Sequence, residues 1–250
     1  MFIISTPQRC GSTWLTRMMA LMTDSRDVYM DGLKMGFRLA APCEPKAVEK
    51  LSEFLRKEPS VKVIKTHDIP SSQFDTVCAA VPEVHILTMH RDFRDTVVSR
   101  YFYLRYYRQS TVGFEALSPA FREFLMVIGG MSDAEALVLL LGTPCVHGWA
   151  REWAAFEGPF KSPNAMRITY DGMLDESDFP KLVEFTGLPL RKRRPFEIEQ
   201  RAETAKTGRD GRARFNRKGR SGEWREWFTP EQGERLNTLA ADECRRQHGK

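Results

Sequence analysis

Apolar residues open the chain as a short run and then return at helical spacing. Residues 2–4 form a continuous apolar stretch typical of a buried strand, and residues 7–11 have the composition of a turn. Apolar residues beyond this turn recur every three or four positions, which predicts a helix capped by Ser12 or Thr13. This apolar face consists of Trp14, Leu15, Met18, Met19 and Met22. The first pattern is therefore strand, small-residue loop and helix.

Strand and helix patterns alternate along the rest of the chain. Apolar runs predict further strands at residues 61–64, 84–89 and 166–170. Helical periodicity predicts helices at residues 46–58, 114–127, 133–141, 146–156 and 179–186, one that follows residues 90–95 and ends at about Tyr107, and a last one starting at Thr229. Residues 23–45 carry no clean period, so we expect a loop there. The alternation predicts an α/β fold with a parallel sheet flanked by helices, and we expect one domain over residues 1–250.

Cationic or titratable residues follow three of the predicted strands. The first strand runs into Arg9, the second into Lys65 and His67, and the third into Arg91. Ligands of open parallel sheets bind outside the carboxyl ends of the strands, so these side chains are expected to face one anion. The loop before Ser12 would add backbone N–H groups and the positive end of a helix dipole. An ordinary strand-to-helix turn is the alternative for this loop taken alone.

Composition narrows the class of protein. The chain has 250 residues, of which 42% are hydrophobic, which is ample for a large core. Its five cysteines are odd in number and lack metal-ligand spacing, so we interpret them as reduced thiols and expect no metal. No apolar run approaches the roughly 20 residues that span a bilayer, and no signal peptide precedes the first strand. We therefore expect a cytoplasmic protein without a membrane partner.

Positive charge is concentrated in one segment. Residues 191–220 hold twelve Lys and Arg against four acids, a local charge of +8 within a chain of net charge +5. This distribution favours an anionic ligand under the segment over a whole surface made for nucleic acid. A solvated charged loop is the other interpretation of the segment.

Four blocks of sequence resemble one family. TPQRCGSTW resembles the 5′-phosphosulfate loop of sulfotransferases that use 3′-phosphoadenosine-5′-phosphosulfate (PAPS), IKTHDIP resembles their KTHxP segment, and HRDFRDTVVSRYFY resembles their 3′-phosphate segment. Near the end of the chain, RKGRSGEW resembles the family's RKGxxGxW. The blocks occur in family order across residues 2–229. The resemblance implies the sulfotransferase fold with a P-loop-like phosphosulfate loop.

The resemblance also implies catalytic roles. Arg9 lies where the family usually has a lysine, and because arginine does not give up its proton, we expect an electrostatic clamp there. Lys65 would stabilise charge on the transferring group and on the leaving phosphate. His67 would take the proton from the acceptor as general base. A structural histidine is the alternative for His67 considered alone.

The remaining matched positions imply binding of the cofactor, with PAPS as donor and adenosine 3′,5′-bisphosphate (PAP) as product. Residues that match the loop around the phosphosulfate are Arg9, Cys10, Gly11, Ser12 and Thr13. Trp14 matches an aromatic residue that packs on adenine, with a core position on the helix face as the alternative, and Tyr170 matches an adenine-side residue. Residues that match the 3′-phosphate site are Arg91, Ser99, Arg217, Lys218 and Gly219. A further adenine contact is expected within residues 200–207.

The expected reaction is transfer of a sulfuryl group from PAPS to a hydroxyl or an amine, by in-line attack and without a metal. A P-loop kinase or NTPase is one alternative, but GxxxxGK[ST] is absent from the chain. A polyanion or nucleic-acid binder that uses residues 191–220 is the other, and such a binder has no need of KTH at a strand end.

The acceptor and the assembly are less specified. Aromatic and methionine residues within 30–40 and 101–131 could line an acceptor pocket or could belong to the core, and we expect a small-molecule acceptor and no nucleic acid. Residues 200–222 are expected to close over the cofactor. Residues 225–234 resemble the short KxxxTVxxxE dimer segment of many cytosolic relatives, so we expect a weak homodimer, although Pro230 also fits a simple helix start.

Overall fold

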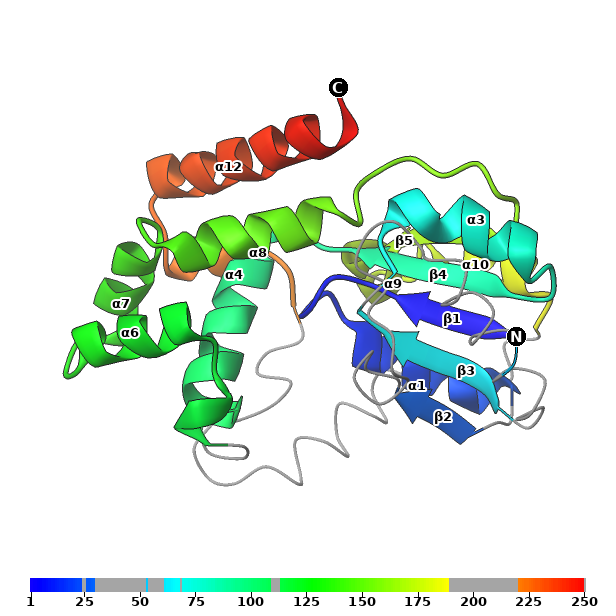
Figure 1. The fold of residues 1–250 in the computed structure, drawn as a ribbon, viewed down its shortest axis with the longest axis horizontal. Coiled ribbons are helices and arrows are strands. Elements are labelled where there is room, and N and C mark those ends of the chain that lie inside the picture. The colour runs from blue at the N-terminus through cyan, green and yellow to red at the C-terminus, as the bar shows by residue number, and fades with distance from the viewer. Residues whose placement is uncertain are drawn as a thin grey trace. The chain divides into compact units, whose positions relative to one another are not determined.

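The computed structural model describes residues 1–23, 26–29, 53, 61–67, 69–108, 113–188 and 220–249. The chain forms two compact units, each of which draws on two stretches of sequence (Figure 1). The first comprises Met1–Arg91 and Ala155–Phe196, and the second comprises Asp92–Ala154 and Glu197–Lys250. A single domain over residues 1–250 stays a prediction.

The first unit is built on a five-stranded parallel sheet with the order β2-β3-β1-β4-β5. Its strands are β1 (Phe2–Ser5), β2 (Arg26–Tyr29), β3 (Val61–Thr66), β4 (His85–His90) and β5 (Ala165–Thr169). The central strand β1 has β3 on one side and β4 on the other, so the strand order reverses beside β1. This reversal is where open parallel sheets bind ligands, at the carboxyl ends of the strands. The prediction of a parallel sheet flanked by helices is confirmed.

Strand β2 was not expected, because the sequence pattern predicts a loop over residues 23–45. The structure instead has a four-residue strand at Arg26–Tyr29 that pairs with β3 at the edge of the sheet. A strand this short, with two charged residues among its four, shows neither an apolar run nor a clear alternation. Its backbone pairing with β3 therefore has no counterpart in the hydrophobic pattern.

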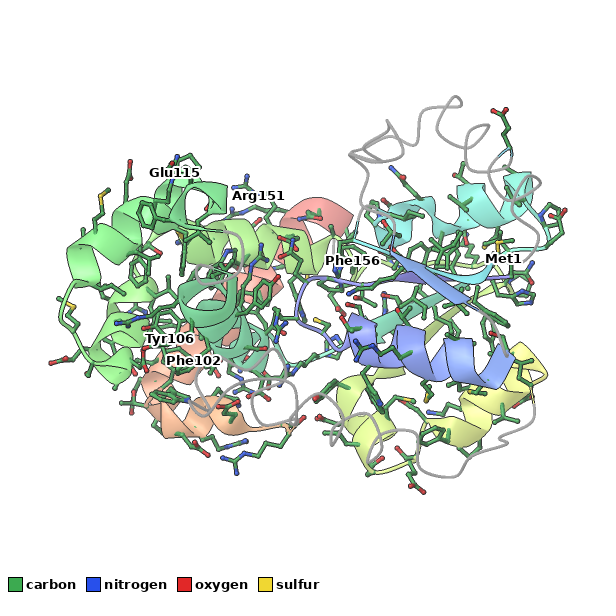
Figure 2. All side chains as sticks on the ribbon, turned by 90° about the horizontal axis from the view of Figure 1, so that it is seen from below. Met1, Phe102, Tyr106, Glu115, Arg151 and Phe156 are labelled. Carbon is green, nitrogen blue, oxygen red and sulfur yellow. The ribbon has the colours of Figure 1, made fainter. Side chains whose placement is uncertain are left out.

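Helices cover both faces of this sheet. Side chains of successive strand residues point to opposite faces, so Ile3 and Ile64 pack in one core, whereas Ile4 and Val63 pack in the other. The first core lies under α3 (Phe74–Ala80). The second lies under α1 (Ser12–Thr23), α9 (Tyr170–Leu174) and α10 (Phe179–Thr186). Figure 2 shows α3 and α1 on opposite sides of the strands.

The second unit is helical. Its described helices are α4 (Phe93–Phe102), α6 (Pro119–Ile128), α7 (Asp133–Leu140), α8 (Pro144–Ala154) and α12 (Pro230–His248). A π-helix, η2 (Tyr103–Arg108), continues α4. Short 3-10 turns are η3 (Phe114–Ala116) and η5 (Glu223–Glu226) here and η1 (Ser71–Gln73) in the first unit. In Figure 1, α12 runs alongside α8, and the side chain of Gln247 donates to the carbonyl of Arg151 at 2.7 Å.

Capping residues decide where these helices begin. The pattern predicts one helix over residues 114–127, but the structure breaks it, because Ser118 caps a new helix whose first residue is Pro119. Ser132 and Glu135 form a capping box at the start of α7. Thr229 and Gln232 form another at the start of α12, where Pro230 is the first helical residue. The predicted starts at Asp133 and Thr229 agree with these caps within one residue.

The π-helix is held by a buried polar cluster, which we call the Asp133 cluster. Asp133 Oδ1 accepts from the hydroxyls of Tyr101 at 2.9 Å and Tyr106 at 2.6 Å, and it lies 3.0 Å from Nη1 of Arg105. Burial of the hydroxyl raises the pKa of Tyr101. The rings of Phe102 and Tyr106, labelled in Figure 2, stack with centroids 6.0 Å apart. Tyr101 is fully buried, whereas Tyr106, Arg105 and Asp133 are partly buried, so the cluster extends from the interior of this unit toward its surface.

Some predictions fall outside the described part of the chain. Nearly all of the predicted helix at residues 46–58 and the basic residues 191–219 lie there, as do the adenine contact expected within 200–207 and most of the expected lid. Within the part that is described, no helix combines the length and the apolar character needed to cross a bilayer.

Candidate functional site

The loop between β1 and α1, residues 6–11, adopts a backbone that few side chains allow. Arg9 has φ of 69° and Gly11 has φ of 92°. A Cβ atom on Gly11 would lie 2.8 Å from Sδ of Met89 and 2.9 Å from Cδ2 of Tyr170. The carbonyl of Gly11 accepts the first helical bond, from the N–H of Leu15 at 3.0 Å. A glycine is therefore required at position 11. Helix α1 begins at Ser12, so Ser12 and Thr13 lie inside its first turn, where the sequence predicts a cap.

Lys65, at the end of β3, reaches the start of this helix. Its Nζ donates to Oγ1 of Thr13 at 2.6 Å. In the parallel register Lys65 is opposite Ile4, and Ile4 belongs to the core under α1, so both side chains are on the α1 face. The structure thus brings together a lysine from one strand end and a hydroxyl from the phosphosulfate-type loop, as the sequence leads one to expect.

His67 is anchored to the beginning of the loop. Its Nδ1 lies 2.7 Å from the carbonyl oxygen of Thr6. Because a carbonyl oxygen only accepts, this contact assigns the proton to Nδ1 and the lone pair to Nε2. The hydroxyl of Ser5 donates to the carbonyl of Ile69 at 2.8 Å, which fixes the chain just beyond His67. The anchoring carbonyl of Thr6 was not foreseen, because a main-chain acceptor leaves no mark on the sequence.

Arg91, at the end of β4, contacts the same loop from the other side. Its side chain is buried, with 8% exposure for the residue, and its Nη1 donates to the carbonyl of Arg9 at 3.1 Å. The guanidinium carbon lies 4.4 Å from the centre of the Tyr170 ring. That ring in turn meets Trp14 edge to face, with centroids 6.1 Å apart. The ends of β3 and β4 therefore carry cationic or titratable side chains onto the stretch that follows β1, and this stretch also contains Cys10, which is fully buried.

Trp14 is a core residue in this structure. It is 7% exposed and packs with Leu15, Met18 and their neighbours under the sheet. The interpretation of Trp14 as a buried residue of the helix face is therefore supported. A contact with adenine stays a prediction, as it does for Tyr170, which is also 7% exposed and begins α9 directly after β5.

The residues matched to a 3′-phosphate site are divided. Arg91 is in the first unit, whereas Ser99 is on α4 in the second, where it is partly exposed. Arg217, Lys218 and Gly219 lie outside the described residues. For these five positions, binding of a 3′-phosphate stays a prediction.

Asp95 ties the end of the RKGRSGEW block to α4, and sequence analysis gave it no role. Its carboxylate accepts from the backbone N–H of Gly222 at 2.7 Å and of Trp224 at 2.9 Å. Arg94 stacks on Trp224 from the same helix, with its guanidinium carbon 4.0 Å from the ring centre. A Cβ atom on Gly233 would lie 2.5 Å from the Trp224 ring, so α12 packs closely on it as well. A buried acid in the first turn of a helix is the signal that could have pointed to Asp95.

The described part of the chain contains no candidate metal site. Groups of three or more His, Cys, Asp or Glu suited to hold an ion are absent from it. The chemistry of the donors around residues 6–13 is instead that of an anion site, since it combines Arg and Lys side chains with a helix N-terminus.

Comparisons with known proteins give the family. A search of curated proteins found no match. The solved structure of a mouse sulfotransferase, SULT7A1, complexed with PAP has 19% identity and a TM-score of 0.56, with 98% of this chain and 84% of that one covered. Retinol dehydratase in complex with androsterone and the inactive cofactor PAP has 18% identity and a TM-score of 0.53, with 97% and 80% covered.

Retinol dehydratase in a complex with retinol and PAP has 17% identity and a TM-score of 0.53, again with 97% of this chain and 80% of that chain covered. At these identities the structures establish a shared fold. The sequence itself matches the sulfotransferase domain model over residues 1–246, which covers nearly the whole chain and both of its units. The chain therefore belongs to the sulfotransferase domain family.

Proposed function

We propose that this sulfotransferase moves a sulfuryl group from PAPS to a hydroxyl or amine of a small-molecule acceptor, with His67 as general base. One observation supports the proposal: Nδ1 of His67 lies 2.7 Å from the Thr6 carbonyl, so the neutral ring carries its basic lone pair on Nε2, and Lys65 and Arg91 contact the same stretch, residues 6–13. A base, an ammonium group and a guanidinium group thus surround one anion-type loop. This is the set of groups that in-line transfer of a charged group requires.

The reaction balances with these residues alone as proton and charge carriers. The acceptor oxygen or nitrogen attacks sulfur, the bond from sulfur to the bridging 5′-phosphate oxygen breaks, and the acceptor proton passes to Nε2 of His67. Negative charge then grows on the leaving oxygen, where Lys65 and Arg9 would stabilise it together with backbone N–H groups of the loop. Arg9 keeps its own proton throughout because the pKa of a guanidinium is far above neutral, so its contribution is electrostatic.

PAPS would be held along the loop and the neighbouring strand ends. Its phosphosulfate would bind to the stretch from Cys10 to Thr13, where the missing side chain of Gly11 lets the loop turn close to Met89 and Tyr170. Tyr170 and Trp14 would lie toward adenine. The 3′-phosphate would bind to Arg91 and Ser99, together with Arg217, Lys218 and Gly219, and PAP would leave as product.

Two retinol dehydratase structures inform the acceptor class. Their complexes contain androsterone or retinol, which are small molecules with a hydroxyl group. This supports a small-molecule acceptor for the present chain and does not distinguish transfer to oxygen from transfer to nitrogen. A single catalytic domain over residues 1–250 and a cytoplasmic location belong to the same proposal.

A ligand-specific thermal shift tests the donor. PAP should raise the melting temperature at lower concentrations than ATP or a single-stranded oligonucleotide, because only PAP carries the 3′-phosphate that the proposed site binds. A larger shift with ATP would favour a kinase or NTPase, and a larger shift with the oligonucleotide would favour a polyanion binder. A screen of hydroxyl and amine acceptors with sulfate-labelled PAPS would then identify the acceptor class.

A further inference from the structure

We propose that Arg91 is a positioning residue of the phosphosulfate loop in addition to a ligand of the 3′-phosphate, so that it couples the two ends of the donor. Only the role as a ligand of the 3′-phosphate rests on the proposed function. The positioning role is argued entirely from contacts within the first unit, between Arg91 and the loop of residues 6–11.

The contact falls on the most constrained part of the loop. Arg91 Nη1 donates to the carbonyl of Arg9, a residue with φ of 69°. Few residues other than glycine adopt this left-handed backbone, and those that do are held by their surroundings. A charge-assisted hydrogen bond to the carbonyl of that same residue holds the peptide plane in place.

Tyr170 connects Arg91 to the other left-handed residue of the loop. The guanidinium lies on the Tyr170 ring at 4.4 Å, and the same ring limits the space at Gly11, where an added Cβ would approach it to 2.9 Å. Arg91 and Tyr170 thus form a support under both ends of the turn that runs from Arg9 to Gly11. A side chain at 8% exposure with these two contacts has a fixed position before any nucleotide arrives.

The consequence is that loss of Arg91 differs from loss of Ser99. Removal of the Ser99 hydroxyl would weaken the proposed 3′-phosphate contact and would leave the bond from Arg91 to the Arg9 carbonyl in place. Removal of Arg91 would also release the Arg9 carbonyl, so the 5′ end of the donor would be affected even in a donor that lacks the 3′-phosphate. The family match alone gives Arg91 no positioning role.

Alkylation of cysteines in the nucleotide-free protein tests the positioning role directly. Cys10 lies between Arg9 and Gly11 and is 0% exposed, whereas Cys78, at 5%, is buried in the core under α3 and Cys145, at 6%, is buried in the second unit. In Arg91→Ala, we expect alkylation of Cys10 by iodoacetamide, measured by mass spectrometry relative to wild type, to rise about tenfold or more. The rates at Cys78 and Cys145 should stay at their wild-type values.

A matched variant and a conservative one complete this experiment. Arg167→Ala removes another arginine of the first unit that donates to main-chain carbonyls, those of Phe156 at 2.7 Å and Gly158 at 2.9 Å, and should leave Cys10 protected. Arg91→Lys keeps the charge but has one nitrogen in place of the fork, so a smaller rise is expected, and this variant also serves if Arg91→Ala does not fold. An unchanged Cys10 rate, or an equal rise at all three cysteines, would overturn the positioning role.

Donor analogues test the coupling. With PAPS, both Arg91→Ala and Ser99→Ala should bind more weakly than wild type. With adenosine 5′-phosphosulfate, which lacks the 3′-phosphate, Ser99→Ala should match wild type, whereas Arg91→Ala should still bind several-fold more weakly. Equal behaviour of the two variants would refute the coupling, and failure of wild type to bind PAPS would instead refute the proposed function.

Discussion

Two polar clusters, one in each unit, differ in what their side chains bind. Lys65 and His67 come from the end of β3 and Arg91 from the end of β4, and each contacts a hydroxyl or a main-chain carbonyl of residues 6–13. In the Asp133 cluster, side chains from the helical unit instead contact one another, and a carboxylate accepts from two tyrosines and an arginine.

This difference distinguishes a candidate ligand-binding site from a cluster that stabilises the fold. In the first cluster each side chain is fixed through one atom, by a main-chain carbonyl for His67 and Arg91 and by the Thr13 hydroxyl for Lys65. In the Asp133 cluster the donors and the negative charge are matched within the protein, which leaves the cluster suited to stabilise the junction of α4, η2 and α7. Changes in the first cluster should therefore alter catalysis, and changes in the second should alter stability.

The largest expected effect on the first cluster comes from Gly11→Ala. The new Cβ would lie under 3.0 Å from Met89 and Tyr170 at a backbone of φ 92°, so the loop must move. We expect PAP binding, measured by calorimetry, to weaken by at least about tenfold while the protein still folds. Gly148→Ala is the matched control, because nothing lies within 4 Å of its Cβ, and it should bind PAP like wild type. Normal binding by Gly11→Ala would contradict the loop's role.

Asp133→Ala should instead lower the free energy of unfolding and leave PAP binding nearly unchanged. It leaves Arg105 and two tyrosine hydroxyls without their shared acceptor in a largely buried setting, and breaking such a pair costs about 3 kcal/mol. Denaturant unfolding should report this loss, with little change in the affinity for PAP. Glu115→Ala removes an exposed partner of Arg122 in the same unit and should cost less than about 1 kcal/mol. A catalytic defect without a stability defect in Asp133→Ala would reverse the assignment.

A smaller effect is expected from His85, at the opposite end of β4 from the site. Its ring lies between those of Phe2 and Phe185, with centroids at 5.6 and 5.4 Å, and burial lowers the pKa of His85 below 6.5. The unfolded chain therefore binds this proton more readily, so stability is complete above pH 6.5 and falls as the pH drops below it. His85→Gln should flatten this part of the pH dependence of unfolding, and an unchanged slope would exclude His85 as its source.

The smallest expected effect concerns assembly. Arg225 stacks on Trp224 with its guanidinium carbon 4.6 Å from the ring centre, and Thr229 caps α12, so residues 225–234 serve as a helix start whether or not they also form an interface. We propose a weak monomer–dimer equilibrium that Arg225→Glu shifts to monomer. Arg235→Glu, an exposed change of the same charge on α12, is the control. Sedimentation that finds only monomer for wild type at every concentration would rule the dimer out.

Much of the fold follows from periodicity and caps, and the exceptions have physical causes. The apolar run of the central strand β1 is continuous because both of its faces are covered, whereas the edge strand β2 has no such run. The break between η3 and α6 was readable from Ser118 followed by Pro119, but the apolar residues on either side masked it.

For the site, strand ends predicted which side chains meet, but not how they are held. Lys65, His67 and Arg91 follow from their positions after apolar runs. Their partners are a hydroxyl of Thr13 and the carbonyls of Thr6 and Arg9, and the two carbonyls are main-chain atoms that every residue carries. The tautomer of His67 and the positioning role of Arg91 therefore could be inferred only from the three-dimensional structure.

The role of His67 as general base is best examined by the turnover of His67→Ala. With sulfate-labelled PAPS and an acceptor found by screening, the variant should lose roughly 10²–10⁴-fold in kcat, because the proton of the acceptor has no base to receive it. The affinity for PAP should stay within a few-fold of wild type. His90→Ala, a change at the neighbouring strand end where Nδ1 lies 2.8 Å from Glu157, should lose far less. Near-normal turnover of His67→Ala would contradict the account.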